Sequence, residues 1–235
     1  MEGGSRDTTG SVECHDRVRS LVTCYLRLHE VAVAVHGDVA GSDWAQAHGR
    51  WLRADGVAGR DAAFDAMPVT LIELDDLAAA DLTPFAGVVL SGRSDQELLA
   101  ARGDDITAFL RRGRVIVYSG QLTGDWLPGV TPFERHEQAP AGAAELAEHP
   151  VLAGVDPADL GASFLYRDGW HRVPEGAEVL AHRSDGTPGA WVARAAGGTV
   201  LVHSGANLLA NAVLDSSAAR IVPQLLAWIG ATAAR

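Results

Sequence analysis

The stretch VIVYSGQ at residues 115–121 decides the fold of this chain, because an apolar run ends there in a sharp polar turn. Continuous apolar runs of this length are typical of strands that are buried on both faces of a parallel sheet. Similar runs lie at residues 31–35, 69–74 and 87–91. Helix-like segments alternate with them, and this alternation predicts an α/β fold with a mostly parallel sheet.

The segments around these strands complete the predicted order. A helix is expected from about residue 104 to 112, closed by Gly113. Glycine, proline and other turn residues are enriched between residues 122 and 168, which predicts irregular structure. Three strands and a final helix follow, with turns at Asp185-Gly186 and Gly197-Gly198 between the strands. These elements are expected at residues 177–181, 190–193, 199–203 and 217–229.

Length and composition favour a single globular unit. The chain has 235 residues, 47% of them hydrophobic, which is enough to build one full core. Residues 1–29 are polar at first and weakly amphipathic later, so we expect a disordered or weakly helical extension before a domain at residues 30–235. A helix capped by Ser42 or Asp43 is expected to follow the first strand. Cys14 and Cys24 are expected to be free thiols.

The charge balance argues against two classes of partner. Thirty acidic and 19 basic residues give a net charge of −11, which repels nucleic-acid phosphates and anionic lipids. No apolar run approaches the roughly 20 residues that span a bilayer. We therefore expect a cytoplasmic protein without nucleic-acid or membrane partners, in which association with a second copy or a partner enzyme stays open.

Three turns are the candidate site, because ligands of open parallel sheets bind beyond the carboxyl ends of the strands. The turns are Ser91-Gly92-Arg93, Tyr118-Ser119-Gly120-Gln121 and His203-Ser204-Gly205. They supply backbone N–H groups, a hydroxyl and an imidazole. No metal site is expected, because the histidines and the two cysteines lack zinc-binding spacing. No cofactor is expected either, because a nucleotide-binding glycine motif is absent.

Several segments together resemble the class I glutamine amidotransferase-like superfamily. Residues 85–92 resemble the strand before its oxyanion loop, residues 115–122 its nucleophile elbow, and residues 175–203 the strands before its catalytic histidine. Residues 149–155, HPVLAGV, resemble a segment of related trehalose-utilisation-type proteins. The resemblance covers about residues 31–230 and implies a flavodoxin-like three-layer sandwich.

The chemistry that the resemblance implies is incomplete in this chain. The family uses a cysteine nucleophile, a histidine and an orienting carboxylate. His203 matches the histidine, but Ser204 and Gly205 replace the proline and glutamate that follow it. Alignment of the strand end places Ser119 at the nucleophile, whereas alignment of Gln121-Leu122 places Val117 or Tyr118 there. Since no alignment gives a cysteine, ordinary glutaminase activity is not expected.

Each candidate residue also has a purely structural explanation. Ser119 is either a nucleophile or a turn residue that bonds its own backbone. His203 is a base, a ligand contact or a buried histidine. Gly92 and Arg93 form an anion-binding loop or an ordinary surface turn.

Two functional hypotheses follow from these candidates. The first is a small-molecule-binding or accessory domain whose ligand contacts Gly92, Arg93, Gly120 and Gln121. The second is a hydrolase or transferase that uses Ser119 and His203, with Asp125 or Asp168 orienting the histidine. Its substrate would be carbohydrate-like if Trp126 or Trp170 faced the pocket. Whether the chain is an enzyme stays open between the two.

Overall fold

The computed structural model describes residues 31–36, 69–73, 79–92, 94–136, 143, 145–162, 164–213 and 216–233. Four expectations lie outside these residues: the extension at 1–29, the helix capped near Ser42, the two cysteines and the position of Arg93.

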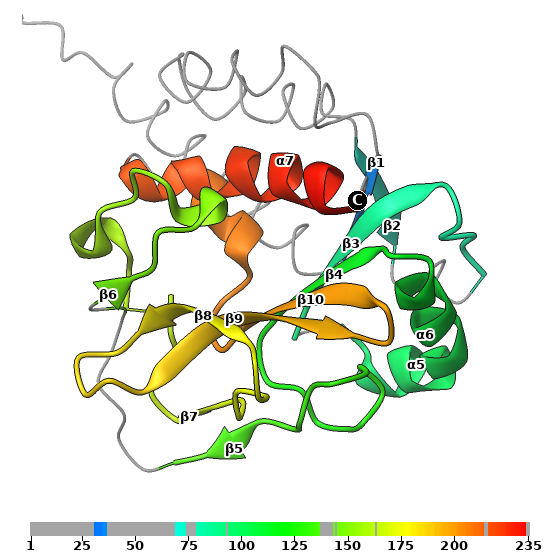
Figure 1. Ribbon diagram of the computed structural model, residues 1–235, viewed down its shortest axis with the longest axis horizontal. Helices are drawn as coiled ribbons and strands as arrows, with labels where there is room; N and C mark the ends of the chain where they lie inside the picture. The colour runs from blue at the N-terminus through cyan, green and yellow to red at the C-terminus, as the bar shows by residue number, and fades with distance from the viewer. Residues whose placement is uncertain are drawn as a thin grey trace, which may run out of the picture.

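An eight-stranded sheet forms the centre of the described part (Figure 1), in the order β2-β1-β3-β4-β10-β9-β8-β6. Its strands are β1 (Val31–His36), β2 (Val69–Glu73), β3 (Phe85–Ser91), β4 (Val115–Ser119), β6 (Glu145–Leu146), β8 (Glu178–His182), β9 (Pro188–Ala195) and β10 (Gly198–His203). A separate two-stranded sheet pairs β5 (Glu134–Arg135) with β7 (Gly169–Trp170). The predicted strands at residues 31–35, 69–74, 87–91, 115–118 and 199–203 are therefore confirmed to within a few residues.

The sheet is mixed, so the expectation of a mostly parallel sheet is wrong for the described strands. Only the neighbours β3, β4 and β10 run parallel to one another. The strand β1 runs antiparallel to both β2 and β3. The strands β10, β9, β8 and β6 form an antiparallel meander.

Two physical reasons explain this difference. Tight turns join β8 to β9 and β9 to β10, and such short connections force antiparallel neighbours, whereas parallel neighbours need a crossover of a dozen or more residues. Gly186 and Gly197 sit in these turns with φ of 80° and 92°. In β1 the apolar run VAVAV has the same pattern in both directions, so the sequence carries no information about the direction of this strand.

Helices cover both faces of the sheet. The helix α7 (Ile221–Ala233) packs with Val89, Val117 and Leu201 in one core cluster. The helices α5 (Gln96–Ala101) and α6 (Gly103–Arg111) pack on the other face, where Ile116 and Val200 belong to a second cluster. Figure 1 shows α7 and the α5–α6 pair on opposite sides of β3 and β4. This arrangement is a mixed α/β architecture.

Short helical turns fill the connections. They are η2 (Pro150–Leu152), η3 (Pro157–Asp159), η4 (Leu208–Val213) and η5 (Ser217–Arg220). Asp95 caps α5 by accepting hydrogen bonds from the backbone N–H groups of Glu97 and Leu98. Gly113 ends the α6 segment in a left-handed conformation with φ of 77°, as the sequence predicts. None of the helices in the described part is long and apolar enough to cross a membrane.

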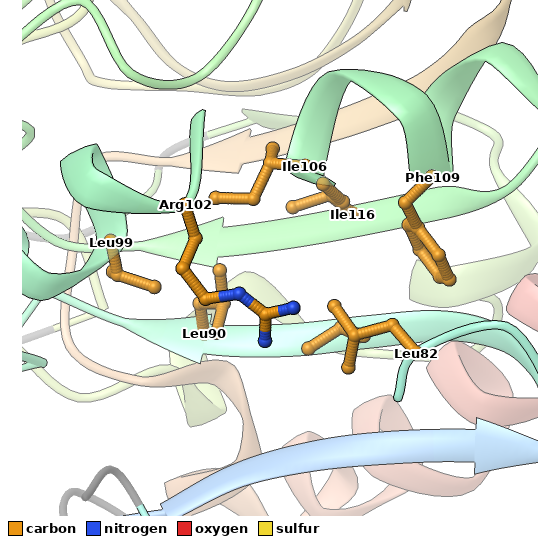
Figure 2. A pocket seen from close by; sticks show the side chains of 8 residues that line it. Leu82, Leu90, Leu99, Arg102, Ile106, Phe109 and Ile116 are labelled. Carbon is orange, nitrogen blue, oxygen red and sulfur yellow. The ribbon is translucent and has the colours of Figure 1, made fainter. Parts of the chain in front are cut away.

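A small apolar cavity lies between the α5–α6 pair and the sheet (Figure 2). Its volume is about 10 Å³, enough for one water molecule. Seven of the eight lining side chains are apolar, and the eighth is Arg102. The Arg102 guanidinium donates to the Ala80 carbonyl and pairs with Asp105 at 3.0 Å. Because the cavity is small and apolar, it is a packing defect of the core and not a ligand site.

Candidate functional site

The structure brings the three predicted turns together at one end of the parallel strands. Ser91 is the register partner of Ser119 in the β3–β4 pair, and His203 is the register partner of Ser119 in the β10–β4 pair. The three residues therefore form one row across the ends of β3, β4 and β10. All three are buried, with exposed fractions of 3%, 1% and 0%. The carboxyl-end rule thus placed the turns correctly as neighbours.

Two glycines just beyond this row make a close backbone contact. A β-carbon added to Gly120 would lie 2.5 Å from the α-carbon of Gly92, and one added to Gly92 would lie 2.7 Å from the α-carbon of Gly120. Gly120 also has φ of 134°, a conformation that other residues rarely adopt. Glycine is required here for both space and backbone geometry.

The backbone N–H groups of these glycines are already used inside the protein. The N–H of Gly92 donates to the carbonyl of Ser119. The N–H of Gly120 donates to the carbonyl of His203 at 2.9 Å. An oxyanion hole needs N–H donors that point at the position of the developing negative charge. In the geometry described, neither of these two donors is free to do so.

The Ser119 side chain is held by the backbone. Its Oγ accepts a hydrogen bond from the N–H of Leu208, at the start of η4, with an N···O distance of 3.3 Å. No hydrogen bond joins this hydroxyl to His203. A serine needs a base within hydrogen-bonding distance to become a nucleophile at neutral pH. The contact that the serine-enzyme hypothesis requires is therefore not formed.

His203 lies fully buried against an aromatic ring. The centroids of the His203 and Phe164 rings are 4.6 Å apart. Neither ring nitrogen makes a hydrogen bond of ordinary geometry. The nearby backbone of Ala206 and Phe164 favours the protonated ring and so opposes the effect of burial on the pKa of His203. Burial lowers the pKa of His203 to about 3, and the charge of Arg183 acts in the same direction. A neutral imidazole with so low a pKa is a weak proton acceptor.

A second buried histidine links the turns after β4 and β10. The Nε2 atom of His171 accepts a hydrogen bond from the backbone N–H of Leu122 at 3.2 Å. An acceptor Nε2 places the proton of the neutral ring on Nδ1, which then donates to Ser204 Oγ at 3.2 Å. Burial lowers the pKa of His171 to about 4. His171 therefore holds the two turns together and does not accept the Ser204 proton.

Gln121 connects the buried turns to two exposed side chains at the surface. Its Nε2 donates to Asp168 Oδ2 at 2.9 Å, and its Oε1 accepts from Arg135 Nη2 at 3.3 Å. Arg135 Nη1 also donates to Asp168 Oδ2 at 3.0 Å. These three side chains close a ring of hydrogen bonds, and we call the surface that they form the polar rim. The side chains of Arg135 and Asp168 are 72% and 47% exposed, so solvent reaches this ring.

The loop that bears Gln121 is fixed from α5. Gln96 Nε2 donates to the Gln121 carbonyl at 2.7 Å. Gln96 Oε1 accepts from the backbone N–H of Thr123 at 2.7 Å and from Trp126 Nε1 at 3.4 Å. One side chain thus joins three points of the loop to the start of a helix, which orders the loop beside the polar rim.

The two tryptophans proposed for a carbohydrate site are already covered. Trp126 is 6% exposed and packs edge-on against Tyr118 in the core. Trp170 stacks on the ring of His136 with centroids 3.7 Å apart, and the Arg183 guanidinium lies over the Trp170 ring at 5.6 Å. A sugar needs an open aromatic face for stacking, so these contacts argue against a carbohydrate site at either residue.

Arg183 is a buried cation whose two Nη atoms bond to backbone carbonyls, while its buried Nε has no hydrogen-bond partner in the described part of the chain. Its Nη2 donates to the carbonyls of Tyr166 and Gly169, and its Nη1 donates to the carbonyl of Pro188. These bonds fasten the segment before β7 to the β8–β9 hairpin. Burial lowers the pKa of Arg183, and the negative charges of Asp185 and Asp168 oppose this shift.

Neither carboxylate proposed to orient His203 contacts it. Asp168 is engaged in the polar rim. Asp125 is exposed and lines a groove of about 380 Å³ together with residues of α5 and α6. In the described part of the chain, no three histidine, cysteine, aspartate or glutamate side chains gather as metal ligands.

Three side chains that build the site, Gln96, Arg135 and Arg183, stand in no recognisable pattern of the sequence. Arg135 was visible only as part of a charged loop, and Gln96 and Arg183 stand in unremarkable surroundings in the sequence. Their partners lie 14 to 33 residues away or are backbone carbonyls. No local pattern could have identified them.

Comparison with known proteins adds no identity. No protein-family model matches this chain, and no curated protein matches its sequence.

The contact between Gly92 and Gly120 gives a first prediction. Gly120→Ala is expected to lower the free energy of unfolding by at least about 3 kcal/mol, because the new methyl group collides with backbone and the φ is unfavourable. Gly186→Ala is the matched control, since Gly186 also has positive φ but open space around it, and it should cost only about 1–2 kcal/mol. Urea unfolding measures both. Equal losses would contradict the close contact.

The two buried histidines give a second prediction. The unfolded chain takes up protons near pH 6.5, whereas the folded chain resists them until the pKa of about 4 for His171 and about 3 for His203. Between pH 6.5 and 4 the unfolded state binds more protons, so the stability should fall as pH falls, by up to about 1.4 kcal/mol per unit for each histidine. Urea unfolding at several pH values measures this slope.

Single substitutions show which histidines cause the pH dependence of the stability. His171→Gln and His203→Gln should each make the slope shallower. The control is His136→Gln, since this ring lies at the surface, and the variant should keep the slope of the wild type. A wild-type stability that is flat across the window would refute buried neutral rings at both positions.

Proposed function

We propose that this chain is an amidotransferase-like domain without glutaminase activity, which binds a small polar molecule or serves as an accessory protein. Two lines of support converge on this proposal. The sequence resembles the superfamily over most of its length but lacks the cysteine and the glutamate of the triad. The ends of β3, β4 and β10 form a sealed, internally bonded junction in place of an open reaction centre.

One observation carries the proposal furthest: the N–H groups of Gly92 and Gly120 both donate to carbonyls of the neighbouring strand ends. Acyl transfer depends on donors that stabilise the oxyanion, and the loss of one such donor costs a factor of about 100 to 1,000 in rate. With both donors committed, and with Ser119 and His203 not hydrogen-bonded to each other, the chemical step lacks its main sources of stabilisation.

The polar rim supports a ligand-binding function and not a catalytic one. Gln121, Arg135 and Asp168 offer an amide, a guanidinium and a carboxylate within one hydrogen-bonded ring. Guanidinium groups favour carboxylates, and carboxylates favour ammonium or amide donors. A ligand with both kinds of group, such as an amino acid, would find a partner for each. We therefore propose that the ligand is a small polar molecule that contacts Gln121 at this rim.

The competing hypothesis is a hydrolase or transferase that uses Ser119 and His203. It would require the two side chains to move into contact and a carboxylate to reach His203. In the described geometry, His203 makes no hydrogen bond to Ser119 or to a carboxylate, so this hypothesis is the weaker of the two.

The third prediction tests for catalysis. The wild-type protein should show no labelling by a fluorophosphonate probe and no hydrolysis of glutamine or of small esters, because Ser119 has no oriented base. Gel fluorescence and ammonia release measure these activities. Labelling or turnover that disappears in both Ser119→Ala and His203→Ala would establish a serine enzyme and reject the binding proposal.

The fourth prediction tests binding at the rim. Thermal shift and calorimetry with amino acids, dicarboxylates and sugars should identify a ligand whose affinity falls by at least about tenfold in Asp168→Asn, because the variant loses a charge that contacts the ligand. Asp185→Asn changes the same charge in the exposed β8–β9 turn and should leave the affinity unchanged. A panel without any binder, or an equal loss in both variants, would contradict the rim as the binding site.

A further inference from the structure

Four arginines gather at the end of the parallel strands opposite the candidate site. Arg111 and Arg112 end the α6 segment, Arg114 precedes β4, and Arg194 belongs to β9. We call this surface the arginine corner. Arg111, Arg112 and Arg194 are exposed, and Arg114 is half-buried. In a chain with a net charge of −11, such a concentration of one basic residue type is a local reversal of sign.

The turn after β9 packs against the backbone at the end of α6 and so brings the segments that carry these arginines next to one another. A β-carbon added to Gly197 would lie 3.6 Å from the α-carbon of Arg111. Arg194 reaches the same turn, with Nη2 donating to the Gly197 carbonyl at 2.6 Å and Nη1 donating to Thr199 Oγ1 at 2.9 Å. The N–H of Thr199 in turn donates to the Arg114 carbonyl at 3.0 Å. Figure 1 shows α6 beside the β9–β10 turn.

The corner keeps its positive charge. None of its four arginines forms an ion pair within the part of the chain that the structure describes. Hydrogen bonds from Thr83 lower the pKa of the nearby exposed Asp81, with a smaller contribution from the charge of Arg112. The Nε atom of Arg114 is buried and has no hydrogen-bond partner. The carbonyls at the end of α6 explain Arg111 in the last turn, and hydrogen bonds to Thr83, Gly197 and Thr199 engage Arg112 and Arg194. None of these contacts explains Arg114.

The backbone of the corner is also closely packed. Gly113 closes the end of α6, where its N–H donates to the Leu110 carbonyl at 2.8 Å. A β-carbon added to Gly198 would lie 2.5 Å from the Arg114 carbonyl oxygen and 2.7 Å from that of Leu110. The turn and the helix end are therefore packed backbone against backbone. A binding surface that is already ordered loses little conformational entropy when a partner binds.

We propose that the arginine corner binds an acidic peptide segment of a partner protein. Guanidinium groups recognise carboxylates through paired N–H donors, and several of them on one surface fit a run of Asp or Glu side chains. A short segment touches the corner alone. A long nucleic acid would extend over the rest of this acidic surface, where repulsion opposes its binding. This interaction does not depend on the ligand of the polar rim.

Fluorescence anisotropy with a labelled oligoglutamate peptide provides the test, at an ionic strength of about 50 mM so that charges at the surface are not fully screened. The wild-type protein should bind this peptide and not a labelled Gly-Ser peptide of the same length. In the double variant Arg111→Gln/Arg114→Gln, the affinity should fall by at least about tenfold.

The matched control is Arg172→Gln/Arg220→Gln, which removes two exposed arginines far from the corner in sequence and changes the net charge equally. It should bind the peptide within about twofold of the wild type. An equal loss in both double variants, or a wild-type protein that does not bind the peptide, would overturn the proposal. Tighter binding of a labelled oligonucleotide of equal charge, lost in the corner variant, would also overturn it in favour of a nucleic-acid partner.

Discussion

The close approach of Gly92 and Gly120 is the constraint on which the candidate site depends. Two backbones can lie this near only where neither residue carries a side chain. Their contact draws the turns after β3 and β4 together, and the N–H of Gly120 adds the end of β10 through the His203 carbonyl. The three parallel strands therefore end in one backbone junction, and the side chains of Ser119 and His203 are buried at this junction.

Burial at this junction determines the charge states of the polar side chains. Removing an imidazole from water disfavours its charged form, so the pKa of His203 falls to about 3 and that of His171 to about 4. Both rings are neutral at physiological pH. Arg183 stays close to them and finds three backbone carbonyls as acceptors. The interior is thus held by hydrogen bonds to backbone and not by paired charges, which suits a structural junction better than a proton-transfer centre.

The two ends of the parallel strands have different characters. At the carboxyl ends, the polar rim combines an amide, a guanidinium and a carboxylate that already bond to one another. At the amino ends, the arginine corner presents cations without ion-pair partners in the described part of the chain. The separation of these surfaces by the length of the strands would allow a small ligand and a partner protein to bind without competition.

The sequence by itself determined the strands predicted at residues 115–118 and 199–203 and the meeting of their turns, because apolar runs and glycine turns are local signals that set local structure. It also showed that no cysteine stands in the turn after the strand at residues 115–118. Only the tertiary structure decided the direction of β1, whose apolar pattern is the same both ways, and the partners of Gln121 and Arg183. Those partners are distant side chains or backbone carbonyls, and hydrogen bonds between distant segments follow from packing, which no local pattern records.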